Sequence, residues 1–82
     1  MMDNSTIFEL INTLQVTNRW LDSGNARMSL SVSNAIKEFN DVAAELKNIE
    51  YLSHSIFSID EIKALHDQII STTKRLEALP YL

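Results

Sequence analysis

Apolar side chains recur at intervals of three and four residues in three separate stretches of the chain. In the first stretch, the recurring positions are Ile7, Leu10, Leu14, Thr17 and Leu21. Because an α-helix has about 3.6 residues per turn, this spacing places them on one face of a helix. The pattern therefore predicts a helix over about residues 7–21.

The ends of this predicted helix carry local signals. Thr6 followed by Glu9 has the spacing of a capping box, and Ser5 and Asn4 are alternative caps. Gly24 lies just past the last apolar position, where a residue in the left-handed conformation commonly closes a helix. We therefore expect the helix to start at Ile7 and to end shortly before the glycine.

The second stretch has the most regular spacing. Its apolar positions alternate by four and three residues: Met28, Val32, Ala35, Phe39, Val42, Leu46 and Ile49. This is the 3.5-residue repeat of a coiled coil, and it predicts a helix over about residues 31–52 that starts between Ser29 and Ser33. Residues 28–33 also alternate apolar and polar side chains, as a strand does. Because no second strand-like stretch offers a partner, we interpret them as a loop or a frayed first turn.

The third stretch predicts a helix over about residues 59–79. Its apolar stripe consists of Ile62, Leu65, Ile69, Thr72, Leu76 and Leu79. Ser58 and Glu61 have the spacing of a capping box, and Phe57 and Ile62 flank it at the positions of a hydrophobic staple. This start is the best marked in the chain.

The scarcity of helix breakers supports an all-α fold, because glycine occurs once, at Gly24, and proline once, at Pro80. The links at about residues 22–28 and 53–57 are short, which makes successive helices antiparallel neighbours. We therefore predict a single domain over residues 1–82, built as a small up-down-up three-helix bundle with coiled-coil-like contacts. The alternative is a helical hairpin with the N-terminal helix packed across it or against a second copy.

Many large apolar residues fall outside the three stripes: Phe8, Ile11, Val16, Trp20, Leu30, Ile36, Tyr51, Ile56, Ile70, Tyr81 and Leu82. One interpretation is that they widen the buried stripe of each helix. The other is that they form an apolar surface for a partner or a second copy. Tryptophan serves both roles, as a core residue and as an interface anchor. The residues predicted to bind protein are Phe8, Ile11, Trp20 and Ile70.

Charge and composition narrow the classes of partner. The chain has 82 residues and a net charge of −4, and Lys74 and Arg75 are its only adjacent basic residues. This balance argues against nucleic acid and against an anionic membrane surface, both of which need clustered cations. The absence of cysteine, of a signal sequence and of a long apolar run predicts a soluble cytoplasmic protein without membrane insertion.

The chain offers little catalytic or metal-binding chemistry. His54 and His66 are its only histidines, too few for a zinc or di-iron site. Asp41 and Glu45 are expected to lie on a solvated outer face, and His66 and Asp67, adjacent in a helix, should diverge. No cysteine can act as nucleophile, and a single glycine excludes a phosphate-binding loop. We therefore predict no catalytic, cofactor-binding or metal-ligating residue, and no enzymatic activity.

The opening stretch from Met1 to Leu14, the compact length and the acidic, cysteine-free helices resemble the lysis-inhibition accessory proteins of T-even bacteriophages, which are cytoplasmic antiholins. The resemblance implies a protein of the host cytoplasm that binds the cytoplasmic part of the phage holin and delays host lysis. The residues themselves leave other functions open. These are a self-assembling structural or secretion-system component, and a small export chaperone. A homodimer or small homo-oligomer fits each of them.

Overall fold

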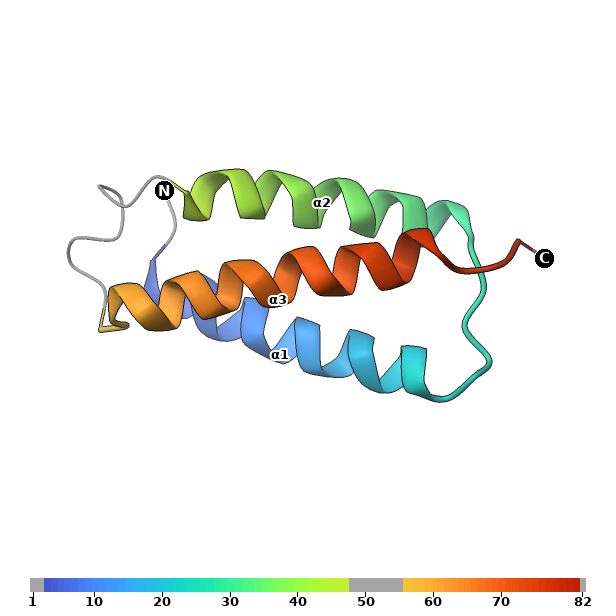
Figure 1. Cartoon of the computed structure of the whole chain (residues 1–82), viewed down its shortest axis with the longest axis horizontal. Coiled ribbons are helices and arrows are strands. Elements are labelled where there is room, and N and C mark those ends of the chain that lie inside the picture. The colour runs from blue at the N-terminus through green and yellow to red at the C-terminus, as the bar shows by residue number, and fades with distance from the viewer. Residues whose placement is uncertain (1–2, 48–55, 82) are drawn as a thin grey trace.

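The computed structural model describes residues 3–47 and 56–81, and three α-helices make up most of these residues. The helices are α1 (Asn4–Asp22), α2 (Leu30–Leu46) and α3 (Ile59–Glu77). Helices α1 and α3 run in the same direction, and α2 runs antiparallel to them (Figure 1). Helix α3 packs against both of the others, in a molecule measuring 43 × 19 × 18 Å. The predicted all-α, up-down-up three-helix bundle is confirmed.

Helix α1 starts earlier than predicted, because its N-cap is Asp3. The Asp3 Oδ1 atom accepts a hydrogen bond of 2.8 Å from the backbone N–H of Thr6, and the Asp3 carbonyl accepts 3.1 Å from Ile7. The predicted cap at Thr6, with Ser5 or Asn4 as alternatives, is therefore wrong. The earlier start places the fully buried Ile7 inside the helix, with its own N–H already bonded.

The link between α1 and α2 has well-defined ends. Gly24 has φ of +79°, the left-handed conformation that was expected after the first helix. The Ser29 side chain caps α2 by accepting a hydrogen bond of 3.2 Å from the N–H of Val32, so the predicted start of the second helix is confirmed. The strand-like residues before it include Met28, whose N–H donates 2.8 Å to the Pro80 carbonyl. This contact, in an isolated bridge between Met28 and Tyr81, ties the link to the C-terminal end.

Helix α2 buries most of the predicted stripe, with one change of position. Val32, Phe39 and Leu46 are buried, but Ala43 is buried in place of the half-buried Val42. A straight helix of 3.6 residues per turn drifts away from a strict 3.5-residue repeat, which accounts for the shift. The helix ends at Leu46, earlier than predicted. The apolar spacing continues to residue 49 and includes no stop signal, so the spacing alone does not predict this end. The rest of the predicted helix, residues 48–52, lies outside the described residues.

Helix α3 begins at the predicted capping box. The Ser58 Oγ atom accepts a hydrogen bond of 3.1 Å from the Glu61 N–H, and the Glu61 carboxylate accepts one of 2.9 Å from the Ser58 N–H. Phe57 packs half-buried against the core, which contains Ile62, as a hydrophobic staple requires. The helix ends at Glu77, two residues before its predicted end.

The core lies between the three helices and uses one apolar face of each. Its buried members are Ile7, Leu10, Leu14, Met28, Val32, Phe39, Ala43, Leu46, Ile62, Leu65, Ile69 and Leu76. Ile11, Ile36 and Ile70 pack half-buried against this core, so they widen the stripes. Among the described residues, no helix is long and apolar enough to cross a membrane.

A polar network joins α1 to α3 beside this core. The Asn18 side-chain amide donates 2.9 Å to the hydroxyl of Thr72, a residue that is almost fully buried. Arg75 donates to the Asn18 side-chain oxygen at 2.8 Å and to the Asp22 carboxylate at 2.7 Å. We call Asn18, Asp22, Thr72 and Arg75 the Asn18 network. It fixes the rotation and register of α1 against α3.

Candidate protein-binding surfaces

An exposed apolar patch lies at the end of the molecule where α1 and α3 both begin. The rings of Phe8 and Phe57 meet edge to face, with centroids 5.1 Å apart. Exposed fractions are 54% for Phe8, 69% for Ile56 and 55% for Ile59. A hydrogen bond of 3.2 Å from the Ile56 N–H to the Asn4 side-chain oxygen holds this stretch against α1. We call Phe8, Ile56, Phe57 and Ile59 the Phe8 patch.

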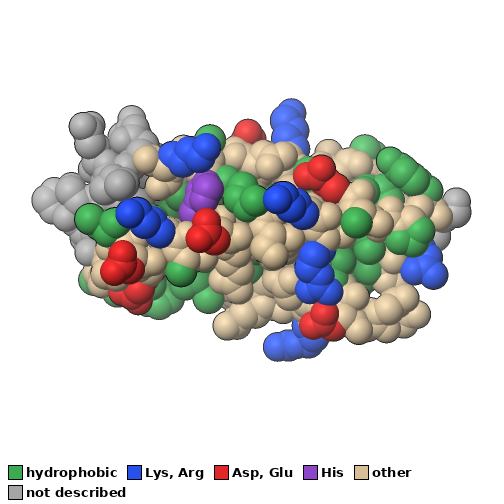
Figure 2. All heavy atoms as spheres, viewed as in Figure 1, with side chains coloured by type: hydrophobic (Ala, Val, Ile, Leu, Met, Phe, Trp, Pro, Cys, Tyr) green, Lys and Arg blue, Asp and Glu red, His purple; other side chains and the backbone are tan. Residues whose placement is uncertain are grey.

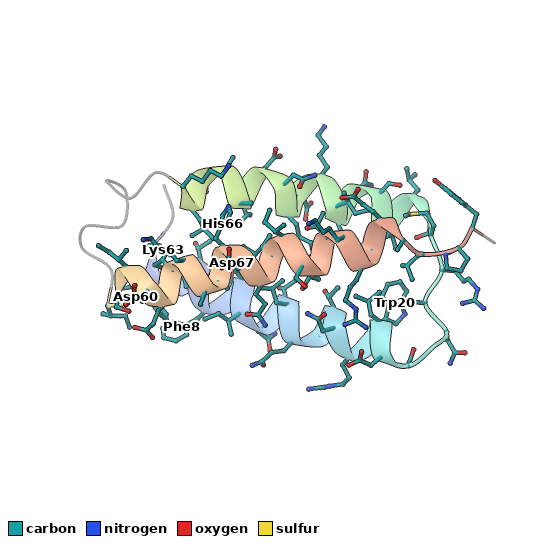
Figure 3. All side chains as sticks on the ribbon, viewed as in Figure 1. Phe8, Trp20, Asp60, Lys63, His66 and Asp67 are labelled. Atoms are coloured by element: carbon teal, nitrogen blue, oxygen red, sulfur yellow. The ribbon has the colours of Figure 1, made fainter. Side chains whose placement is uncertain are left out.

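The Phe8 patch has acidic surroundings. The parallel starts of α1 and α3 bring Asp3, Glu9, Asp60 and Glu61 to the same end, where Lys47 and Lys63 add two positive charges. Figure 3 labels Asp60 and Lys63 at this end, together with Phe8. Apolar and acidic side chains appear next to one another there in Figure 2. This end therefore offers apolar contact area within a negative field.

Two of these carboxylates are held in the charged form by their capping roles. The backbone N–H of Thr6, and then its side chain, donate to Asp3 and lower the pKa of that carboxyl. The backbone N–H of Ser58, and then its side chain, lower the pKa of Glu61 in the same way. Both groups therefore stay negative even in mildly acidic solution.

A second set of exposed apolar residues lies at the opposite end of the bundle. Trp20, Leu30 and Tyr81 are exposed there, and Arg19 and Arg27 are their basic neighbours. Figure 2 shows apolar side chains gathered at this end, where α2 starts and α3 finishes. The two ends therefore carry apolar residues in fields of opposite sign.

The four residues predicted to bind protein do not form one cluster. Phe8 and Trp20 lie at opposite ends of α1, about 18 Å apart by the helical rise (Figure 3). Trp20 is 39% exposed, whereas Ile11 and Ile70 are half-buried against the core. Phe57 and Ile59 belong to the Phe8 patch but not to the residues predicted to bind protein, because Phe57 has the spacing of a hydrophobic staple and Ile59 begins a helix. Tyr51 and Leu82 lie outside the described residues.

The described residues hold little that resembles a catalytic site. No group of three or more histidine, aspartate or glutamate side chains among them could hold a metal ion. Asp41 and Glu45 are exposed, as expected for a solvated face. The His66 Nδ1 atom lies 3.8 Å from the Asp67 carboxylate, so the expectation that these side chains diverge is wrong. The His66 Nε2 atom is buried without a hydrogen-bond partner in the described part of the chain, and His54 lies outside it.

The chain is a small three-helix bundle that exposes apolar residues at both ends, with acidic neighbours at one end and basic neighbours at the other. No protein-family model, curated protein or solved structure matches the chain significantly.

Proposed function

We propose that this protein is a non-enzymatic protein–protein interaction module that binds a segment of another protein on the Phe8 patch. The observation that carries the proposal is the contact between Phe8 and Phe57, surrounded by the exposed Ile56 and Ile59. Removing such side chains from water contributes about 25 cal/mol per Å² of apolar area. Aromatic residues supported by neighbouring apolar contacts are the usual centres of protein interfaces.

The charges around the patch specify the chemistry of the partner. Asp60 and Glu9 are exposed, and the capping carboxylates of Asp3 and Glu61 add further negative charge. A segment with apolar anchors flanked by lysine or arginine would fit this surface, whereas an acidic segment would be repelled. The bound segment is therefore apolar with basic flanks.

The resemblance to T-even lysis-inhibition proteins supplies a biological setting for this activity. In that setting the protein is a cytoplasmic antiholin in the host cell, and its partner is the soluble, cytoplasmic part of the phage holin. Binding would hold that part of the holin in an inactive arrangement and so delay host lysis. This role requires neither a cofactor nor insertion into the membrane.

The test is a binding titration with the soluble domain of a T-even holin. Ile56→Ser and Ile59→Ser change exposed side chains, so the fold should survive while the affinity falls at least tenfold, about 1.4 kcal/mol. Leu30→Ser, at the opposite end, is the matched control and should bind like the wild type. Equal binding by all four proteins would rule out the Phe8 patch. No binding by the wild type would rule out the antiholin role.

A further inference from the structure

The outward side of α1 carries both apolar and charged residues. Its exposed members, opposite the buried Ile7, Leu10 and Leu14, are Phe8, Glu9, Asn12, Val16, Arg19 and Trp20. We call these six residues the α1 outer face. Val16 is 53% exposed and points away from the bundle, where it adds nothing to the core. This face is available for contact with another molecule.

The α1 outer face has a register that suits a second copy of itself. Phe8 and Trp20 lie six residues on either side of Leu14, and Glu9 and Arg19 lie five residues on either side of it. If two α1 helices meet antiparallel with a twofold axis at Leu14, each residue lies level with its counterpart from the other chain. Glu9 then faces the partner subunit's Arg19, and the symmetry repeats that pair.

The charges on this face are free to make such a pair. No ion pair or side-chain hydrogen bond involves the Glu9 carboxylate or the Arg19 guanidinium among the described residues. The only described use of Glu9 is its backbone carbonyl, which accepts from the Thr13 hydroxyl at 2.9 Å. Arginine and carboxylate make charge-assisted hydrogen bonds when a contact excludes water from them.

The charge distribution of the whole molecule favours the same orientation. The half of the molecule around the starts of α1 and α3 has seven acidic side chains and two lysines. These are Asp3, Glu9, Asp41, Glu45, Asp60, Glu61 and Asp67, and Lys47 and Lys63. The half around the ends of these helices has four cations and two acids. These are Arg19, Arg27, Lys74 and Arg75, and Asp22 and Glu77. Two molecules side by side and antiparallel place each acidic half beside a basic half. A parallel pair would place like charges together.

We propose that a second copy of this chain docks antiparallel on the α1 outer face and forms a closed, twofold-symmetric dimer. Its central contacts are Val16 and Asn12, flanked by the paired Glu9 and Arg19 and by the aromatic rings of Phe8 and Trp20. The dimer and the proposed function share Phe8, but Ile56 and Ile59 belong only to the Phe8 patch and lie outside the α1 outer face. A partner bound through those isoleucines is therefore tested separately.

The size of the interface sets the strength of the dimer. Helix α1 has 19 residues. That makes it about 28 Å long, and one such helix face buries less than the roughly 800 Å² per subunit of a standard interface. The dimer should therefore form in the micromolar range or more weakly. Because exposed ion pairs contribute to it, salt should weaken it.

A charge-swap experiment tests the register. Sedimentation equilibrium in low salt should show that Glu9→Arg and Arg19→Glu each weaken the dimer about tenfold, since each change places two like-charged pairs in the interface. The double variant Glu9→Arg/Arg19→Glu restores opposite charges and should dimerise within about threefold of the wild type. Glu38→Arg, an exposed change on α2, alters the net charge by as much as Glu9→Arg and should leave the dimer unchanged.

Each outcome of this experiment decides the proposal. Recovery in the double variant requires residues 9 and 19 of different chains to face each other, which only the antiparallel register provides. A wild-type protein that stays monomeric up to about 1 mM would overturn the dimer. A dimer that the single reversals leave intact, or that the double variant fails to recover, would overturn the interface. Circular dichroism of each variant confirms that the helices remain folded.

Discussion

Single side chains set where each helix begins. Asp3, Ser29 and Ser58 each accept a hydrogen bond from a backbone N–H that lies in the first turn and has no partner within the helix. The negative charges of Asp3 and Glu61 also lie at the positive ends of their helices. In a chain of this size, a few such contacts are a considerable fraction of the total stability, roughly 4–12 kcal/mol.

We expect Ser58→Ala to lower the free energy of unfolding by about 0.5–2 kcal/mol, because it removes the acceptor for the Glu61 N–H. Urea unfolding followed by circular dichroism measures this change. Ser71→Ala is the matched control, since Ser71 is exposed in the middle of the same helix. A loss no larger for Ser58→Ala than for Ser71→Ala would contradict a stabilising role for the capping box.

The same cap should make stability depend on pH. Hydrogen bonds from Ser58 lower the pKa of Glu61 from its ordinary value of 4.5, so folding favours its charged form. The stabilisation is therefore complete above pH 4.5 and is lost as the pH falls through the lower pKa of the folded state. Glu61→Gln cannot titrate, so the stability difference between wild type and this variant should shrink on acidification. Urea midpoints of both proteins between about pH 6 and pH 3 measure this, and a constant difference would disprove it.

Between helices, the Asn18 network holds α1 against α3. Asn18→Ala should cost about 1–3 kcal/mol, because it leaves the buried Thr72 hydroxyl without its donor and removes one acceptor from Arg75. Thr72→Val removes the hydroxyl at nearly constant volume. A double-mutant cycle should give a coupling of at least about 0.5 kcal/mol between the two positions. Strictly additive effects would show that the contact contributes nothing.

Substitutions in the buried stripe of α2 should lower the free energy of unfolding more than the changes above. Phe39→Ala should cost about 3–5 kcal/mol and Leu46→Ala about 2–5 kcal/mol, because both residues are buried and their removal leaves cavities. Leu30→Ala, at an exposed position of the same helix, should change stability by less than about 0.5 kcal/mol. Chemical denaturation of the three variants compares these values. Wild-type midpoints for both core variants would mean that α2 does not pack as described.

How far the sequence predicts these elements depends on whether the signal is local. The start of α3 is predictable because Phe57, Ser58, Glu61 and Ile62 form one contiguous motif. The start of α1 is not, because residues 3–6 are all polar types that cap helices, and nothing local to them marks Asp3 as the residue whose carboxylate accepts from Thr6. The spacing of apolar residues does not encode rotation between helices, so it cannot predict contacts formed across them.

The candidate surfaces show the same limit. Phe8 is recognisable as surplus to the core, but its contact with Phe57 depends on how α1 and α3 meet. Trp20 is recognisable in the same way, and its separation from Phe8 already follows from the predicted helix over residues 7–21, which contains both. Ile11 and Ile70 belong to the margin of the core, because a packed helix buries more than a narrow stripe.

For the molecule as a whole, the separation of charge along the 43 Å axis is the property that sequence order conceals. The acidic residues are scattered along the chain, but the up-down-up topology (Figure 1) brings seven of those that the structure describes into the half of the molecule where α1 and α3 begin. Such a field orients an approaching charged partner before contact and speeds its association. It also disfavours parallel association of two copies.

This geometry predicts the size at which self-association stops. A twofold interface uses the same surface on both chains, so a dimer leaves no unpaired α1 outer face and cannot grow. In light scattering over a concentration series, the mass should therefore rise from the chain mass of 9.3 kDa to a plateau at twice that value. A self-assembling structural component, the alternative function for this fold, would instead continue to grow. Scattering that increases without a plateau would favour that alternative. Glu9→Arg, which replaces both symmetry-related charge pairs of the closed interface by like charges, should move the rise from monomer mass to dimer mass to about tenfold higher concentration.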